Sequence, residues 1–172
     1  MLPERRLSHA QGYLGLGMVA EAAAELEHLS GPDAKTPAAL AVRLAVLQEQ
    51  ADWPAVRDLA GTLVRQGDAE PGLWITWAYA TRRAESLAAA ETILLQAEIS
   101  HPDEPTIQFN LGCYASQQGK FTVARRRIAR AIALEAAFAA LAVTDPDLAP
   151  LRAAHPGDFL PPPKKSPSSE NR

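Results

Sequence analysis

The stretch PTIQFNLGCYASQQGKFTVARRRIARAIALEA, residues 105–136, sets the pattern for most of the chain. It holds two amphipathic segments separated by Gly119, which predicts two helices joined by a tight turn. The same arrangement recurs three times toward the N-terminus, in steps of 34 residues. The prolines that open the four copies are Pro3, Pro37, Pro71 and Pro105. Because a period of this length is typical of helical hairpins in an array, residues 3–136 are expected to form four hairpins in one register.

The composition favours an all-α protein and gives no electrostatic reason to expect nucleic acid as a partner. Alanine is the commonest residue in the 172-residue chain, only 6% of the residues are aromatic, and β-branched residues form no alternating runs. The formal net charge is -3, whereas binding to nucleic acid calls for a concentrated basic face. The length suffices for one hydrophobic core or for one array of several hairpins.

The N-terminal residues MLPERRLSHA carry charges at once and lack the apolar stretch of a secretory signal. No apolar run approaches the length that is needed to span a bilayer, so membrane insertion is not expected. The single Cys113 cannot form an internal disulfide or a thiolate metal site, which suits a reducing compartment. We therefore expect a cytoplasmic protein of the bacterial type.

Capping and turn residues place the ends of the expected helices. In the first hairpin, helices are expected over about residues 4–16 and 19–30, with Gly17 as the left-handed residue between them. The second hairpin opens at Thr36–Pro37, an N-cap hydroxyl followed by a proline whose missing N–H is not needed there. Further breaks are expected at Gly31–Pro32, Asp52–Trp53–Pro54, Gly67, Glu85–Ser86, Ser100–His101–Pro102 and Gly119–Lys120.

The repeated positions resemble the tetratricopeptide repeat family, and the resemblance covers about residues 3–136. In that family bulky apolar residues stand at the fourth and seventh positions, and small ones at the eighth, twentieth and twenty-seventh. Small residues let neighbouring helices approach closely, while large ones fill the gaps. The matching residues include Ala10, Tyr13, Gly17, Ala22 and Leu26, then Trp74, Trp77, Ala78, Ala90, Leu94, Ala97 and Pro102, and finally Leu111, Gly112, Gly119, Phe121, Ala124, Ile128 and Ala131. The resemblance implies an all-α, right-handed superhelical solenoid of antiparallel helix hairpins.

The second hairpin departs from the family pattern. Bulky residues occupy its small positions, and Ala60 stands where a large residue is usual. The bulky residues are Leu44, Val56 and Leu63. We expect volume to be redistributed within this hairpin.

After residue 136 the register fails, and residues 137–160 are expected to cap the last hydrophobic face of the array. Phe138–Val143 is expected to be a short apolar helix. Asp145–Leu148 resembles the capped start of a new helix, which Pro150 is expected to cut short. Residues 161–172 lack apolar periodicity and are expected to be a disordered tail.

Nothing in the sequence forms a catalytic or metal-binding constellation. The run GLGMVA at residues 15–20 has the letters of a dinucleotide fingerprint, but a helix precedes it, so its glycines are interpreted as turn residues. The four histidines show no i, i+4 pair of the kind that binds metal on a helix. Cys113 has no histidine near it in sequence to act as a base. No catalytic residue, metal site or cofactor is expected, and the chain is not expected to be an enzyme.

The resemblance also implies a concave groove, formed by the first helix of each hairpin, that binds a segment of a partner protein. In this family an asparagine at the position of Asn110 often holds a peptide backbone, since an amide donates and accepts hydrogen bonds at once. Arg83 is suited to a carboxylate and Tyr79 to an apolar side chain, although Arg82 and Arg83 also suit a solvated helix end. The residues expected to reach into the groove are Tyr79, Arg82, Arg83, Phe109, Asn110, Cys113 and Gln117.

Several alternatives stay open for the function of such a chain. The positions that form a carboxylate clamp in chaperone-binding members of the family do not carry the clamp residues, so recognition of that kind of tail is not expected. The chain resembles type III secretion chaperones in size and acidity, which makes a dedicated chaperone the alternative to a peptide-binding module. Self-association is a further possibility, and residues 138–159 would fill the groove themselves if they folded back. The arginines at 125–130 are interpreted as a solvated face or as a contact for an acidic partner.

Overall fold

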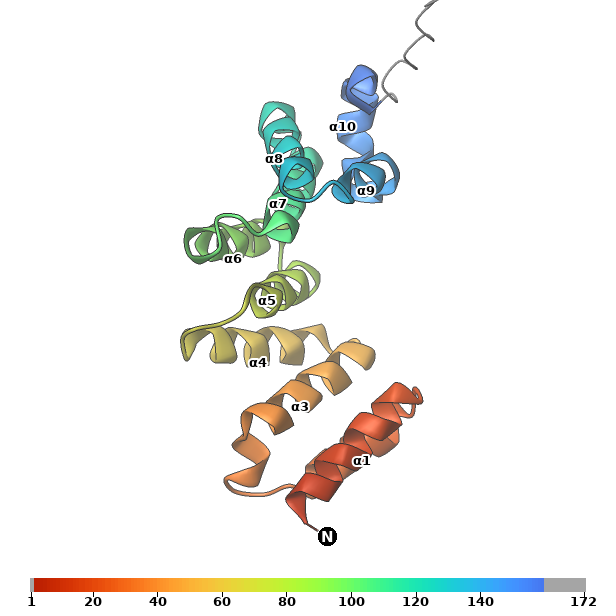
Figure 1. The fold of residues 1–172 in the computed structure, drawn as a ribbon, viewed down its shortest axis with the longest axis vertical. Helices are drawn as coiled ribbons and strands as arrows, with labels where there is room; N and C mark the ends of the chain where they lie inside the picture. Colours follow the sequence, from red (N-terminus) through yellow and green to blue (C-terminus); the bar gives the residue numbers. More distant parts are fainter. Residues whose placement is uncertain (1, 160–172) are drawn as a thin grey trace, which may run out of the picture. The chain divides into compact units, whose positions relative to one another are not determined.

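The computed structural model describes residues 2–159, and every regular element among them is helical (Figure 1). The helices are α1 (Pro3–Gly15), α2 (Val19–Glu27), α3 (Pro37–Glu49), α4 (Trp53–Arg65), α5 (Pro71–Ala84), α6 (Leu87–Ser100), α7 (Pro105–Gln117), α8 (Phe121–Leu134), α9 (Phe138–Thr144) and α10 (Ala149–Ala154). Short 3₁₀ turns are η1 (Asp33–Lys35), η2 (Pro146–Leu148) and η3 (Pro156–Phe159). The all-α class and the helical-repeat fold are therefore confirmed. The expected tail, residues 161–172, lies outside the described residues.

The chain divides into two compact units. Unit 1 comprises Met1–Ile99 and holds the first three hairpins, and unit 2 comprises Ser100–Arg172 and holds the fourth hairpin with the helices that follow it. The domain boundary at residue 136, which the sequence favours, stays a prediction.

Most start and stop signals of the sequence act where they are expected. Proline occupies the first position of α1, α3, α5 and α7, where no intrahelical N–H donor is required. The Thr36 hydroxyl accepts a hydrogen bond from the Ala39 N–H at 3.2 Å and caps α3. Gly17 and Gly119 both adopt φ 72°, a left-handed conformation that carries no steric penalty for glycine.

Two expected helix boundaries are wrong. Helix α2 ends at Glu27 instead of Ser30, and Leu29 lies outside the helix with its side chain buried in the core. Pro150 does not terminate a helix. It lies in the first turn of α10, where its missing N–H costs no hydrogen bond, so the chain continues from η2 into α10.

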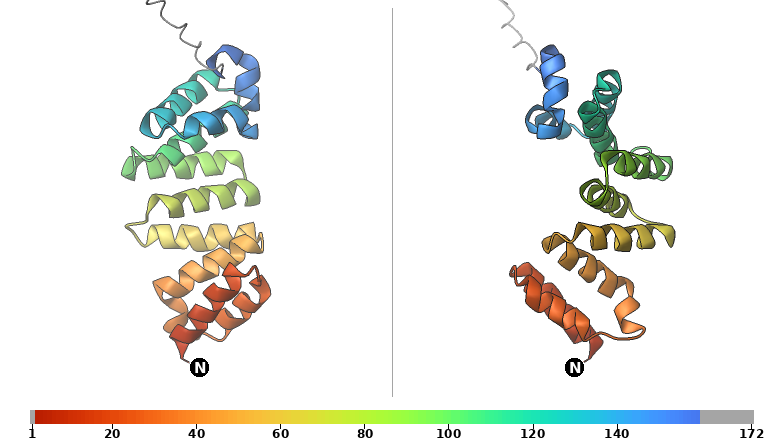
Figure 2. Two further views of the ribbon diagram at one scale, coloured as in Figure 1. Left: turned by 45° about the vertical axis from the view of Figure 1, so that its right-hand side comes forward. Right: turned by 180° about the vertical axis from the view of Figure 1, so that it is seen from behind.

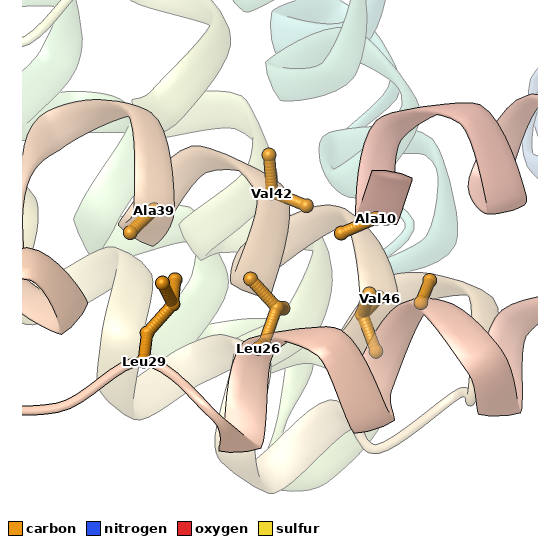
Figure 3. Close-up of a cluster of buried hydrophobic side chains, with 7 residues drawn as sticks. Ala10, Leu26, Leu29, Ala39, Val42 and Val46 are labelled. Carbon is orange, nitrogen blue, oxygen red and sulfur yellow. The ribbon is translucent and has the colours of Figure 1, made fainter. Parts of the chain in front are cut away.

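The core of unit 1 begins where the first hairpin packs on α3. Leu26 and Leu29 point toward α3, where Val42 and Ala39 face them (Figure 3). Ala10 on α1 is fully buried beside this cluster, and its small side chain allows the close helix approach that the repeat pattern predicts.

In the irregular second hairpin, two of the three bulky residues lie beside the unusual alanine. Leu44 and Val56 pack in one buried cluster with Ala60, so the bulky residues offset the small one. Trp77 of α5 lies against Gly61 of α4, because a Cβ atom at Gly61 would stand only 2.8 Å from two atoms of the indole. The absence of a side chain at this position creates the room for a large ring.

Unit 2 is built on the α7–α8 hairpin, with α9, η2 and α10 packed against it (Figure 2). Gly112 is a point of close approach within the hairpin, since a Cβ atom there would lie 2.6 Å from Cδ1 of Ile128. Leu148 and Leu151 have no exposed surface, so these two residues of the segment after α8 belong to the core of this unit.

Candidate functional site

The seven residues expected to line a groove are divided between the two units. Tyr79, Arg82 and Arg83 lie on α5 in unit 1. The other four, Phe109, Asn110, Cys113 and Gln117, lie on α7 in unit 2. The structure places the two sets in very different environments.

In unit 1, Trp53, Tyr79 and Arg83 form a cluster that we call the Trp53 cluster. The Cζ atom of Arg83 lies 4.6 Å from the centroid of the Tyr79 ring and 5.0 Å from that of the Trp53 ring. The two rings meet edge to face, with centroids 5.3 Å apart and an angle of 78° between their planes. Both distances from the guanidinium are within the range of cation–π attraction.

Local structure explains how the Trp53 cluster forms. Tyr79 and Arg83 are four residues apart on α5 and therefore share one face of that helix. Trp53 is the first residue of α4, held there because the Asp52 carboxylate accepts a hydrogen bond from the Ala55 N–H at 3.2 Å. The sequence pattern predicts a helix break at Trp53 but not its contact with α5, and a bulky aromatic at a helix start is the signal that could have indicated it.

The side chains of the Trp53 cluster are partly or fully exposed to solvent. The Tyr79 side chain is 42% exposed, Arg83 is exposed, and Trp53 is half-buried. No carboxylate of the described residues forms an ion pair with Arg83. Arg82 is half-buried on the same helix. Within residues 2–159, the cluster thus offers two aromatic surfaces and a cation that lacks an acidic counter-ion.

In unit 2, the segment Phe138–Ala154, which we call the C-terminal segment, packs against α7. The Phe109 ring packs on the Phe138 ring with centroids 4.9 Å apart. Phe109 is 5% exposed and Cys113 is 2% exposed. The expectation that a partner can reach Phe109 and Cys113 is wrong for this structure, because the chain buries both side chains itself.

Hydrogen bonds fix the C-terminal segment at the other end of α7. The Ser116 hydroxyl accepts a hydrogen bond from the backbone N–H of Leu151 at 3.3 Å, at a buried point. The Gln117 side-chain amide donates to the backbone carbonyl of Asp147 at 2.8 Å. Asn110 is half-buried, and Gln117 is exposed apart from this contact. The residues that share the face of α7 bearing Phe109, here called the Phe109 face, are Phe109, Cys113, Ser116 and Gln117.

A third feature is a shallow hollow of about 380 Å³ in unit 1 with Trp77 in its wall. Its charges are largely paired, since Arg57 contacts Asp58 at 2.9 Å and Glu85 at 3.8 Å. Arg65 lies 5.7 Å from the Trp77 ring centroid. The full lining is Arg57, Asp58, Arg65, Trp77, Thr81, Glu85, Ala89, Thr92 and Ile93.

The arginine run of α8 is mostly exposed, as expected of a solvated face. Arg127 is the exception, because it is half-buried and donates to the Gln108 side-chain oxygen at 2.8 Å. Arg130 forms an ion pair with Asp103. These contacts join α8 to α7 and to the loop that precedes α7.

The described residues offer neither a metal site nor a membrane-spanning helix. No three of their histidine, cysteine, aspartate or glutamate side chains are grouped so that they hold a metal ion. No helix in the same part of the chain combines the length and apolarity that crossing a bilayer requires.

Successive antiparallel hairpins with small residues at their crossing points define the class of the fold, a tetratricopeptide-type helical repeat. Among solved structures, the chain is similar to a thermophilic tetratricopeptide repeat protein of Thermus thermophilus. The TM-score is 0.61 at 20% sequence identity, and the match covers 95% of this chain and 93% of that one. At this identity the likeness shows the fold. No family model matches the sequence, and no curated protein matches it.

Proposed function

We propose that this chain is a non-catalytic protein-interaction module that binds a peptide segment or helix of another protein. The observation that supports the proposal is the Trp53 cluster, in which an exposed aromatic pair flanks an arginine that has no carboxylate partner among the described residues. Aromatic and arginine side chains are the residue types that most often dominate the energy of protein interfaces. The single buried Cys113 fits a reducing compartment such as the cytoplasm.

The geometry of the Trp53 cluster indicates which partner chemistry it recognises. The Arg83 guanidinium already lies against the Tyr79 and Trp53 rings, so little side-chain entropy is lost when its N–H groups bind a ligand. A carboxylate bound to arginine gains charge-assisted hydrogen bonds. A neighbouring apolar side chain gains contact with the exposed part of Tyr79. We infer that a bound segment presents an acidic residue beside an apolar one.

A displayed library of random peptides tests this proposal even though the partner is not identified. The wild-type chain is expected to enrich peptides with an acidic residue next to an apolar one. Individual peptides are then titrated by fluorescence anisotropy against wild type, Arg83→Glu and Arg126→Glu. Arg126 is an exposed arginine on α8, so its reversal changes net charge equally.

The charge reversal at Arg83 is expected to weaken binding by at least about tenfold, because it replaces an attraction by a like-charge repulsion. Arg126→Glu is expected to change binding by less than about threefold, since an exposed charge outside the cluster is screened by salt. Equal binding by wild type and Arg83→Glu would remove the Trp53 cluster from the proposed function.

A further inference from the structure

The C-terminal segment depends on its docking to unit 2 for its helical structure. Its elements α9, η2 and α10 contain 7, 3 and 6 residues. Isolated helices shorter than about 12 residues are marginal in water, so none of these elements is stable alone. The buried side chains Phe138, Leu148 and Leu151 supply the apolar contact that keeps the segment ordered.

The way in which α7 holds this segment resembles recognition of a ligand. The hydrogen bonds that Ser116 and Gln117 of the Phe109 face make to the segment go to its backbone groups. Backbone contacts do not depend on the ligand's side chains, so they bind any segment of the right conformation. Selectivity then comes from the apolar side chains that are buried.

Cys113 lies between the two sets of contacts. It follows Phe109 by one helical turn and precedes Ser116 and Gln117 by about one turn on the same face of α7. The Phe138 ring packs at one end of this row, and the backbone of Asp147 and Leu151 is bound at the other. Cys113 is 2% exposed and shares the face of α7 on which the segment docks, so its reactivity is expected to increase when the segment leaves.

We propose that the Phe109 face is a second binding surface, for a helical segment of a partner protein that presents an aromatic residue and a Leu-x-x-Leu pair. Residues 138–154 are its internal occupant, with Phe138 as the aromatic and Leu148 and Leu151 as the pair. The partner segment binds by displacing them. This extends the proposed function to a second surface and rests on it only in taking the partner to be a protein.

Because a partner segment must displace the internal one, its binding depends on how tightly the internal segment is held. A tethered segment has an effective concentration in the millimolar range, so it outcompetes an equal free segment unless its own contacts are weakened. The apparent affinity for a free segment is the intrinsic affinity multiplied by the fraction of molecules in which the face is open. Weakening the internal occupant is therefore expected to strengthen binding of an external one.

The test uses the full chain in three forms: wild type, Leu151→Ala and Leu141→Ala. Leu141 belongs to the same segment but is exposed, so it is the matched control. The readout is the rate at which the thiol reagent DTNB modifies Cys113, the only cysteine of the chain. Leu151→Ala is expected to raise this rate at least about tenfold, because truncating a buried leucine removes much of the docking energy. Leu141→Ala is expected to leave it unchanged.

The probe for the opened face is a labelled synthetic peptide of residues 137–156. It is expected to bind the Leu151→Ala chain at least about tenfold more tightly than wild type and to protect Cys113 again. A peptide in which Phe138, Leu148 and Leu151 are all alanine is expected to do neither. Arg83→Glu is expected to leave all of these readouts as in wild type, which separates this surface from the Trp53 cluster.

Hydrogen exchange on the wild-type chain keeps the proposal testable if the variants fold poorly. Amides of residues 138–154 are expected to exchange at least about tenfold faster than those of α8, since the segment opens without unfolding of the hairpin. Equal exchange of the two regions would show that the segment is an integral part of the fold, and would overturn the proposal. So would a peptide that fails to bind the Leu151→Ala chain, or a dimer in which a second copy supplies the segment.

Discussion

The backbone N–H of Leu151 donates a hydrogen bond to the hydroxyl of Ser116 across 35 residues of sequence. Leu151 lies in the first turn of α10, where backbone N–H groups have no partner within the helix. Ser116 on α7 therefore satisfies α10 as a capping residue does, from a different helix. This bond and the packing of Phe138 on Phe109 attach the C-terminal segment to the fourth hairpin.

Ser116→Ala tests the energetic weight of that bond. The substitution leaves the buried Leu151 N–H without an acceptor, which is expected to lower the free energy of unfolding by about 1–3 kcal/mol. Urea denaturation measures the loss. Ser8→Ala on the exposed surface of α1 is the control and is expected to change stability by less than about 0.5 kcal/mol. Similar values for both variants would contradict a role for the Ser116 hydroxyl.

Gly112→Ala tests the close contact between α7 and α8. The added Cβ atom would stand 2.6 Å from Cδ1 of Ile128, so the substitution is expected to destabilise the chain by about 1–3 kcal/mol. Adding Ile128→Val, which removes Cδ1, is expected to restore part of the loss in a double-mutant cycle. Gly72→Ala on α5 meets no atom within 4 Å and is expected to be neutral or stabilising by up to about 1 kcal/mol.

Ala51 and Gly17 both have a positive φ, so replacing the alanine by glycine and the glycine by alanine is expected to change stability in opposite directions. Ala51, between α3 and α4, adopts φ 54°, which is unfavourable for an L-residue. Ala51→Gly is expected to raise the free energy of unfolding by up to about 1 kcal/mol. Gly17→Ala, at φ 72° in open space, is expected to lower it by about 1–2 kcal/mol. Thermal denaturation followed by circular dichroism compares the pair, and a shift of the same sign in both would contradict the assignment.

Replacing Arg83 is expected to cost little stability. Each cation–π contact at an exposed site contributes about 0.5–1 kcal/mol, so Arg83→Glu should lower the free energy of unfolding by no more than about 2 kcal/mol. Arg83→Lys keeps the charge and is expected to lose less. Urea denaturation of the three forms is the measurement. A loss well above this limit would show that Arg83 is a structural residue.

The periodic features were accessible to sequence reasoning because they depend on neighbouring residues. Thr36 caps α3, and the proline at the start of each first helix follows from the missing N–H. The buried alanine at Ala10 and glycine at Gly112 follow from the repeat, in which helix crossings need small residues. Each of these is a statement about one turn or one helix face, which a single window of sequence contains.

The contacts of the predicted site residues could not be predicted from neighbouring residues in the sequence. Tyr79 and Arg83 were expected at a binding surface, but their contact with Trp53 joins two helices that no shared period relates. Phe109 and Cys113 lie on the expected face of α7, yet both are buried, and Phe109 packs on Phe138 of the C-terminal segment. The prediction for Pro150 was wrong because a proline in a first turn and a proline that ends a helix look alike in sequence.

The sequence by itself determined the four hairpins, their register and most of their caps, since helix propensity, turn chemistry and the 34-residue period are local or repeating properties. Only the tertiary structure decided which side chains the residues of the Trp53 cluster and of the Phe109 face contact. The aromatic–arginine arrangement at Trp53 and the docking of residues 138–154 on α7 rest on contacts between residues far apart in the chain. Such contacts form by complementary shape and hydrogen bonding in three dimensions, which no period along the sequence encodes.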